Sequence, residues 1–190
     1  MKEHLRTALM MTLVTTVILG VIYPLAVTGL AQILFPAKAN GSLLNSNGKT
    51  VGSHLLGQTF SAPGYFHSRP SAAGDGYDAS SSGGSNLGPT NHQLIDRVNA
   101  DVQTLRAENP SAPIPVDLVT TSASGLDPDI SPASAYFQIP RVARQRHLSE
   151  SALHALIDQH VTPRQLGVLG EPRVQVLELN SALESLRPAH

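Results

Sequence analysis

The hydrophobic pattern begins with an uncharged run near the N-terminus, over residues 7–35. As a helix these 29 positions would extend for about 43 Å, whereas the hydrocarbon core of a bilayer is about 30 Å thick. The run therefore predicts a transmembrane helix that tilts or emerges at an interface, with Pro24 as a candidate kink. A signal peptide is the alternative, because Ala37-Lys38-Ala39 has the pattern of a cleavage site. The run is, however, about twice as long as a signal-peptide core.

The charges beside this run predict its orientation. Residues 1–6 carry Lys2 and Arg6 against Glu3, whereas the stretch after the run carries only Lys38 and Lys49, spread apart. Positive residues concentrate on the cytoplasmic side of a span. We therefore expect a cytoplasmic tail at 1–6, a helix in a bacterial-type inner membrane at 7–35, and a soluble periplasmic domain at 36–190.

One long amphipathic segment stands out in the soluble part. Residues 91–109 place apolar side chains on one helical stripe, formed by Leu94, Ile95, Val98, Val102 and Leu105. Asn91 can cap the start of this helix, and Asn109-Pro110 ends it.

Shorter elements follow this helix. Residues 116–119 are a strand candidate, and Ser131-Pro132 predicts the start of a helix that Pro140 interrupts. Ser149 can cap a further helix, in which Leu153, Leu156 and Ile157 form the buried face and Leu148 contacts Leu153 as a hydrophobic staple. Residues 173–179 alternate like a strand, and a last helix is expected from Asn180 or Ser181. The mixture predicts a single soluble α+β domain behind one transmembrane helix.

Two further segments are predicted to form a turn and a loop. Asn47-Gly48 is typical of a β-hairpin turn. The neighbouring Gly48-Lys49-Thr50 matches the end of a phosphate-binding loop, but the first glycine of that motif is misplaced, so the hairpin is favoured. Residues 74–90 are rich in Gly, Ser, Asp and Asn, and the run at 80–86 cannot bury apolar area, so a surface loop is predicted.

Composition narrows the possible chemistry. The formal net charge is −1, which gives no field to attract nucleic acid. The chain has no cysteine, so disulfides and thiol catalysis are excluded. The eight histidines show no metal-ligand spacing, and no Gly-x-Ser-x-Gly elbow occurs. Residues alone therefore indicate a tethered accessory domain without a visible catalytic or metal site.

An aromatic segment with one His and one Arg is the candidate partner interface. It contains Tyr65, Phe66, His67 and Arg69. Such aromatics are more often core residues, so both interpretations stay open. Large rings and a guanidinium are nevertheless the composition of interface hot spots, and we take these four residues as the predicted partner contact.

Six sequence blocks together resemble the C subunit of the Kdp potassium-transporting P-type ATPases. They occupy residues 56–60, 65–72, 82–87, 121–127, 138–143 and 170–174. The resemblance extends from end to end, includes the span and keeps the order of the blocks.

The resemblance implies a subunit role. In this family the C subunit assembles with a channel-like potassium-binding subunit, a P-type ATPase pump subunit and a small single-span subunit. Potassium is the transported ion, and hydrolysis belongs to the pump subunit; its Asp-Lys-Thr-Gly phosphorylation motif is missing from this sequence. The chain is therefore expected to be a non-catalytic subunit, needed for assembly and stabilisation, without a tightly bound cofactor.

The resemblance also implies a possible contact with ATP. A catalytic-chaperone role, raising the ATP affinity of the pump subunit, is proposed for the family, and the block Ser82, Gly83, Gly84, Ser85 and Asn86 resembles an ABC-type signature loop. That role conflicts with a periplasmic domain, since ATP is used in the cytoplasm. The alternatives are a periplasmic cap that braces the channel-like subunit without nucleotide contact and, in another class, a membrane-tethered sensor or binding module.

Overall fold

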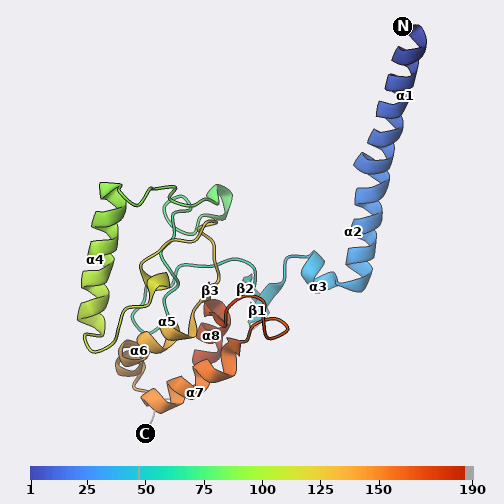
Figure 1. Cartoon of the computed structure of the whole chain (residues 1–190). Helices are drawn as coiled ribbons and strands as arrows, with labels where there is room; N and C mark the ends of the chain where they lie inside the picture. Colours follow the sequence, from blue (N-terminus) through green and yellow to red (C-terminus); the bar gives the residue numbers. More distant parts are fainter. Residues whose placement is uncertain (47, 187–190) are drawn as a thin grey trace. The chain divides into compact units, whose positions relative to one another are not determined.

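A computed structural model describes residues 1–46 and 48–186. The chain divides into two compact units, Met1–Thr50 and Val51–His190. The first contains a long helix, and the second is a mixed domain of helices and short strands, as Figure 1 shows. The predicted class, one N-terminal apolar helix followed by an α+β domain, is confirmed.

The N-terminal helix is continuous from Lys2 to Leu34. It consists of α1 (Lys2–Val17), a π-helical turn (Ile18–Ile22) and α2 (Tyr23–Leu34). The π-helical turn ends two residues before Pro24, whose ring disturbs the hydrogen bonding of the preceding turn. The most apolar 18-residue window of the N-terminal helix has a mean hydropathy of 2.1, so the length and composition of this helix suit a membrane span.

A short helix and a β-hairpin follow the N-terminal helix. They are α3 (Pro36–Ala39) and the strands β1 (Leu43–Ser46) and β2 (Lys49–Ser53), which form a two-stranded sheet. The predicted hairpin strands are confirmed, and Lys49 opens a strand rather than the helix that a phosphate-binding loop requires. Asn47, the first residue of the predicted turn, lies outside the described residues.

The larger unit combines helices with a small antiparallel sheet. Its strands are β3 (Asp129–Ile130), β4 (Val161–Thr162) and β5 (Arg173–Gln175), in the order β3-β5-β4. Its helices are α4 (His92–Glu108), α5 (Pro132–Phe137), α6 (Ile139–Arg146), α7 (Glu150–His160) and α8 (Val176–Leu183), with 3-10 turns at Ala79–Ser81 and Val116–Leu118.

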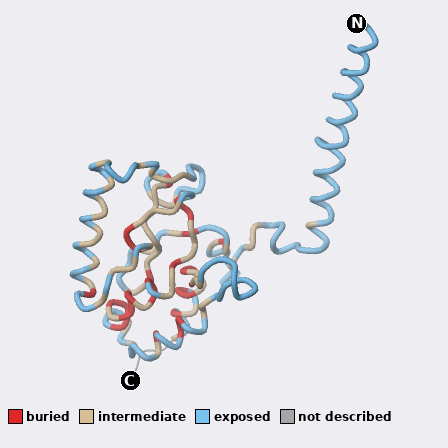
Figure 2. Tube along the Cα trace, viewed as in Figure 1, coloured by how far each residue is buried: buried red, intermediate tan, exposed pale blue. Residues whose placement is uncertain are grey.

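The hydrophobic core lies between α5, α6, α7, α8 and β5, where Figure 2 shows most of the buried residues. It is formed by Phe66, Ile130, Ala135, Ile139, Val142, Ala143, Leu153, Leu156, Ile157, Val174, Val176, Leu179 and Leu183. The predicted buried face of α7 is confirmed, and Leu148 packs against the same core.

The predicted helix caps are confirmed. The side chain of Asn91 accepts a hydrogen bond from the amide of Gln93 at the start of α4, and Ser131 and Ser149 cap α5 and α7 in the same way. Pro140 lies in the first turn of α6, so the predicted interruption is also confirmed. In the apolar stripe of α4, Ile95 is exposed and the other residues are half-buried; none belongs to the core.

One strand prediction is wrong, and another is confirmed only over its first three residues. Residues 116–118 form a 3-10 turn, because Asp117 turns back to bind Ser131 and Ser134 and so prevents an extended course. The predicted strand 173–179 stops at Gln175, whose side chain accepts from the amide of Glu178 and caps α8. The apolar residues that follow are buried with helical rather than alternating spacing.

Candidate functional site

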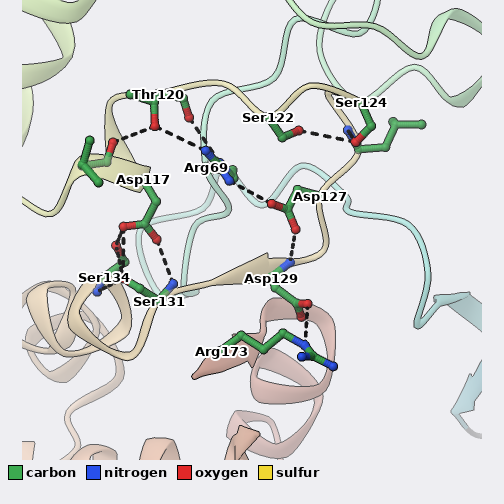
Figure 3. A network of polar contacts seen from close by, with 12 residues as sticks. Arg69, Asp117, Thr120, Ser122, Ser124, Asp127, Asp129, Ser131, Ser134 and Arg173 are labelled. Atoms are coloured by element: carbon green, nitrogen blue, oxygen red, sulfur yellow. Dashed lines mark hydrogen bonds and ion pairs between the residues drawn. The ribbon is translucent and has the colours of Figure 1, made fainter. Parts of the chain in front are cut away.

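The sequence blocks of the resemblance meet in the folded domain around Arg69. Its Nη1 donates to Oδ2 of Asp127 at 2.9 Å and its Nε donates to the carbonyl oxygen of Thr120 at 3.2 Å, as Figure 3 shows. Blocks 65–72 and 121–127, more than 50 residues apart in sequence, are thereby joined by a charge-assisted bond. The guanidinium of Arg69, which is predicted to contact a partner, therefore uses most of its hydrogen-bond donors within the domain.

The serine-glycine block at 82–86 is hydrogen-bonded to the same segment, residues 121–127. Ser82 Oγ and the amide of Gly83 both donate to the carbonyl oxygen of Ser124, at 2.9 and 2.8 Å. A Cβ at Gly84 would lie 3.1 Å from the carbonyl oxygen of Ala123, so this glycine permits a close approach. A Cβ at Gly83 would meet nothing within 4 Å, so this position faces open space.

A second group of hydrogen bonds is formed by Ser71 and Tyr77. Ser71 Oγ donates to the carbonyl oxygen of Gly125 at 2.6 Å and accepts from the amide of Tyr77. The hydroxyl of Tyr77 donates to the carbonyl oxygen of Arg69 at 2.7 Å, and burial raises the pKa of this phenol. Gly125 has a φ of +67°, and a Cβ there would lie 2.7 Å from the amide nitrogen of Ala73, so only glycine fits without strain.

Asp117 anchors the start of α5. Its carboxylate accepts from the amide of Ser131 at 2.8 Å and from the hydroxyls of Ser131 and Ser134 at 3.0 and 2.6 Å. Burial by itself raises the pKa of Asp117, but these donors outweigh it and hold the pKa below its ordinary value. Asp117 is therefore a structural acceptor.

Asp129 and Arg173 form the next ion pair, at 3.0 Å (Figure 3). Burial raises the pKa of Asp129, Arg173 opposes this shift, and the nearby carboxylates of Asp127 and Glu178 add to it. A hollow of about 520 Å³ lies here, and the charged groups that line it are Arg69, Asp117, Asp127, Asp129, Glu171 and Arg173.

The aromatic block divides between core and surface. The side chain of Phe66 is 0% exposed, so the prediction that it contacts a partner is corrected: the ring belongs to the core. The hydroxyl of Tyr65 donates to Glu184 at 2.5 Å, and the guanidinium of Arg146 lies 4.5 Å from the centre of its ring. Partner contacts of Tyr65, His67 and Arg69 remain predictions.

Three polar residues that the sequence did not single out hold this block. Asn180 bonds both the amide and the carbonyl of Phe66, each at 2.9 Å, and Gln138 bonds the amide and the carbonyl of His67 at 2.7 and 3.1 Å. Arg141 donates to the carbonyl oxygens of Pro63 and Tyr65. Gln138 and Arg141 lie in a block of the resemblance, whereas no local pattern pointed to Asn180.

Arg141 is itself buried, with 8% of its surface exposed. Its Nε donates to Glu108 at 2.8 Å and its Nη2 to Gln138 at 2.6 Å. Burial, and then the charge of Arg141, lower the pKa of His67, which keeps that imidazole neutral near pH 7. Within residues 1–46 and 48–186, no three His, Asp or Glu side chains converge to hold a metal ion.

Comparisons with known proteins cover almost the whole chain. The sequence model described as "KdpC: K+-transporting ATPase, c chain" matches residues 5–185. The chain is 60% identical over 185 residues to a potassium-transporting ATPase KdpC subunit of Acidobacterium capsulatum, with 97% of this chain and 99% of that protein covered.

Two more relatives carry the same name. The KdpC subunit of Koribacter versatilis is 58% identical over 188 residues, covering 99% of this chain and 97% of the relative. That of Caulobacter vibrioides is 59% identical over 189 residues, covering 99% and 96%. The chain therefore belongs to the KdpC family, the c chain of K+-transporting ATPases.

Proposed function

We propose that this chain is a membrane-anchored, non-hydrolytic accessory subunit that assembles and stabilises a potassium-transporting ATPase complex. The observation that carries the proposal is the convergence of the sequence blocks. Their polar side chains bind one another, as in Arg69–Asp127 and Ser82–Ser124. Because these polar groups already bond one another, the arrangement favours a rigid surface that docks a partner over a reactive centre.

The helix supplies the anchor in this proposal. Residues 7–35 cross the inner membrane, with Lys2 and Arg6 in the cytoplasm and the larger unit in the periplasm, in keeping with the positive-inside bias. The partners are the channel-like potassium-binding subunit, the P-type pump subunit and the small single-span subunit. The periplasmic unit braces the channel-like subunit.

Assembly with and without the chain tests this role. The other subunits are expressed alone or with the full chain, purified in detergent and assayed for potassium-dependent ATP hydrolysis. The intact, active complex is expected only with the chain, and the purified chain alone hydrolyses no ATP. Hydrolysis by the chain alone, or full activity of the other subunits without it, would contradict the proposal.

Nucleotide contact by the serine-glycine loop is the second candidate. Of the amides in this loop, that of Gly83 binds Ser124, whereas those of Gly84, Ser85 and Asn86 have no hydrogen-bond partner among the described residues. Exposed backbone amides of this kind can bind an anion. This function requires the loop to reach the cytoplasmic side, or an indirect effect on the pump subunit.

Gly83→Val tests this second function. The position faces open space, so the substitution leaves the fold intact while its bulk blocks an approaching phosphate. If the loop contacts nucleotide, the assembled complex will need more ATP for half-maximal activity. If it braces a partner instead, the ATP requirement will stay unchanged.

A further inference from the structure

The segment between β4 and β5 projects apolar side chains into solvent. Residues 162–171 are all exposed, and Leu166, Val168 and Leu169 are 90%, 73% and 57% exposed. The segment is nevertheless ordered as a hairpin. The amide of Gln165 donates to the carbonyl of Leu169 and the amide of Leu169 donates back to Gln165, both at 2.9 Å. We call residues 165–169 the hairpin tip.

The turn of the hairpin tip is occupied by an unfavourable residue. Leu166 and Gly167 have φ values of +53° and +76°, and the amide of Val168 donates to the carbonyl of Gln165 at 3.2 Å. Positive φ at both central positions is the pattern of a type I′ turn, for which Asn-Gly is the preferred sequence. Leucine at position 166 is unfavourable both for the turn conformation and for solubility. A contact with a partner outside the domain would offset this unfavourable free energy.

The hairpin that carries the tip leads into the charged hollow at Arg69 and Asp129. Glu171 and Arg173 line that hollow, and Glu171 lies two residues beyond the end of the tip. Four carboxylates and two guanidinium groups line the hollow, which leaves two negative charges in excess. Arg164 pairs with Glu171 at 2.5 Å, which leaves one negative charge in excess among these groups.

This charge decides between two kinds of occupant for the apolar tip. An anionic lipid surface would be repelled by Glu171, whose side chain is 78% exposed, and by the hollow behind it. A protein segment with a lysine or arginine would place its cation in the hollow and its apolar residues on the tip. Val116 also lines the hollow, is 70% exposed, and adds a further exposed aliphatic side chain to this surface.

We propose that the hairpin tip and the adjoining hollow dock a basic segment of a partner subunit, one in which aliphatic side chains flank a lysine or arginine. The inference rests on the proposed function, because it names the surface through which the domain braces its partner. The aliphatic side chains supply the apolar contact, and the carboxylates select a cationic partner.

Retention of the chain in the purified complex tests the surface. Leu166→Asn and Val168→Asn are each expected to speed loss of the chain during detergent washes about tenfold. Ile95→Asn, which alters an exposed aliphatic on α4, is the matched control and keeps wild-type retention. Since asparagine suits the turn, Leu166→Asn will not lower the unfolding midpoint of the chain. Glu171→Lys is expected to weaken retention and to reduce its dependence on salt.

A fluorescent label distinguishes a protein partner from lipid. The chain has no cysteine, so Val168→Cys accepts a single environment-sensitive dye. The dye should shift to the blue when the whole complex assembles, and not when the full chain alone is reconstituted in vesicles of phosphatidylcholine and phosphatidylglycerol. A shift in those vesicles would assign the tip to lipid and overturn the inference.

The outcomes separate this inference from the proposed function. If the wild-type chain does not co-purify with the other subunits, the proposed function fails. If the wild-type chain co-purifies and both tip variants are held as firmly as Ile95→Asn, the proposed function stands and the docking surface is wrong.

Discussion

Arg141→Ala is predicted to destabilise the domain more than other arginine substitutions on its helix. The arginine pairs with Glu108 at 2.8 Å, and the two side chains are only 10% and 15% exposed. It also donates to the carbonyl oxygens of Pro63 and Tyr65, which link the aromatic block to α6. Its removal leaves a buried carboxylate and two carbonyls without their donor.

The size of the effect follows from the burial of this pair. Removing one partner of a buried ion pair costs about 3–5 kcal/mol, because the other charge stays uncompensated. A loss of 1 kcal/mol lowers the unfolding midpoint of a domain of this size by about 3–4 °C. The expected shift is therefore about 10–20 °C.

Thermal unfolding of the full chain in detergent, followed by the near-UV circular dichroism of its tyrosines, measures this shift. Arg144→Ala is the matched control, since Arg144 lies on the same helix and is exposed. Glu108→Gln keeps an oxygen that can accept from Arg141, so its shift should be smaller. A midpoint for Arg141→Ala equal to that of Arg144→Ala would refute the reasoning.

Two further predictions concern the polar framework. Gly125→Ala should lower the free energy of unfolding by about 1–3 kcal/mol, because alanine is strained at a φ of +67°, whereas Gly83→Ala should change it little; equal urea midpoints would contradict this. Asp117 has a lowered pKa in the fold, so the unfolded chain takes up a proton first and stability is lost as the pH falls below about 4. Ser134→Ala removes a donor, brings the pKa of Asp117 nearer its ordinary value and should flatten this acid loss in unfolding midpoints measured across pH; an unchanged slope would count against the role of Asp117.

Much of the fold could be predicted because its signals are local. Asn91, Ser131 and Ser149 cap the helices they were expected to cap, since a cap needs only its own sequence neighbours. The long apolar helix follows in the same way from residues 7–35. Of the strand predicted over 173–179, only Arg173–Gln175 is confirmed. From Val176 on the alternation competes with helical burial, which depends on the rest of the core.

The candidate site depended on contacts between distant residues, which the sequence pattern does not encode. Arg69 was recognised, but its pairing with Asp127 joins segments 58 residues apart. Phe66 was placed at an interface on composition, although it is a core residue whose backbone is held by Asn180. The importance of Leu166 follows only from its backbone conformation and its exposure, which the sequence pattern does not show.

The side of the membrane on which the larger unit lies tests the central claim most directly. Cysteine is introduced separately as His4→Cys in the tail and as Thr90→Cys in the exposed loop of this cysteine-free chain. Cells permeabilised only at the outer membrane are treated with a membrane-impermeant maleimide. A periplasmic brace predicts labelling of Thr90→Cys in these cells and of His4→Cys only after lysis. Labelling of His4→Cys with protection of Thr90→Cys would contradict the account and place the serine-glycine loop on the side where ATP is used.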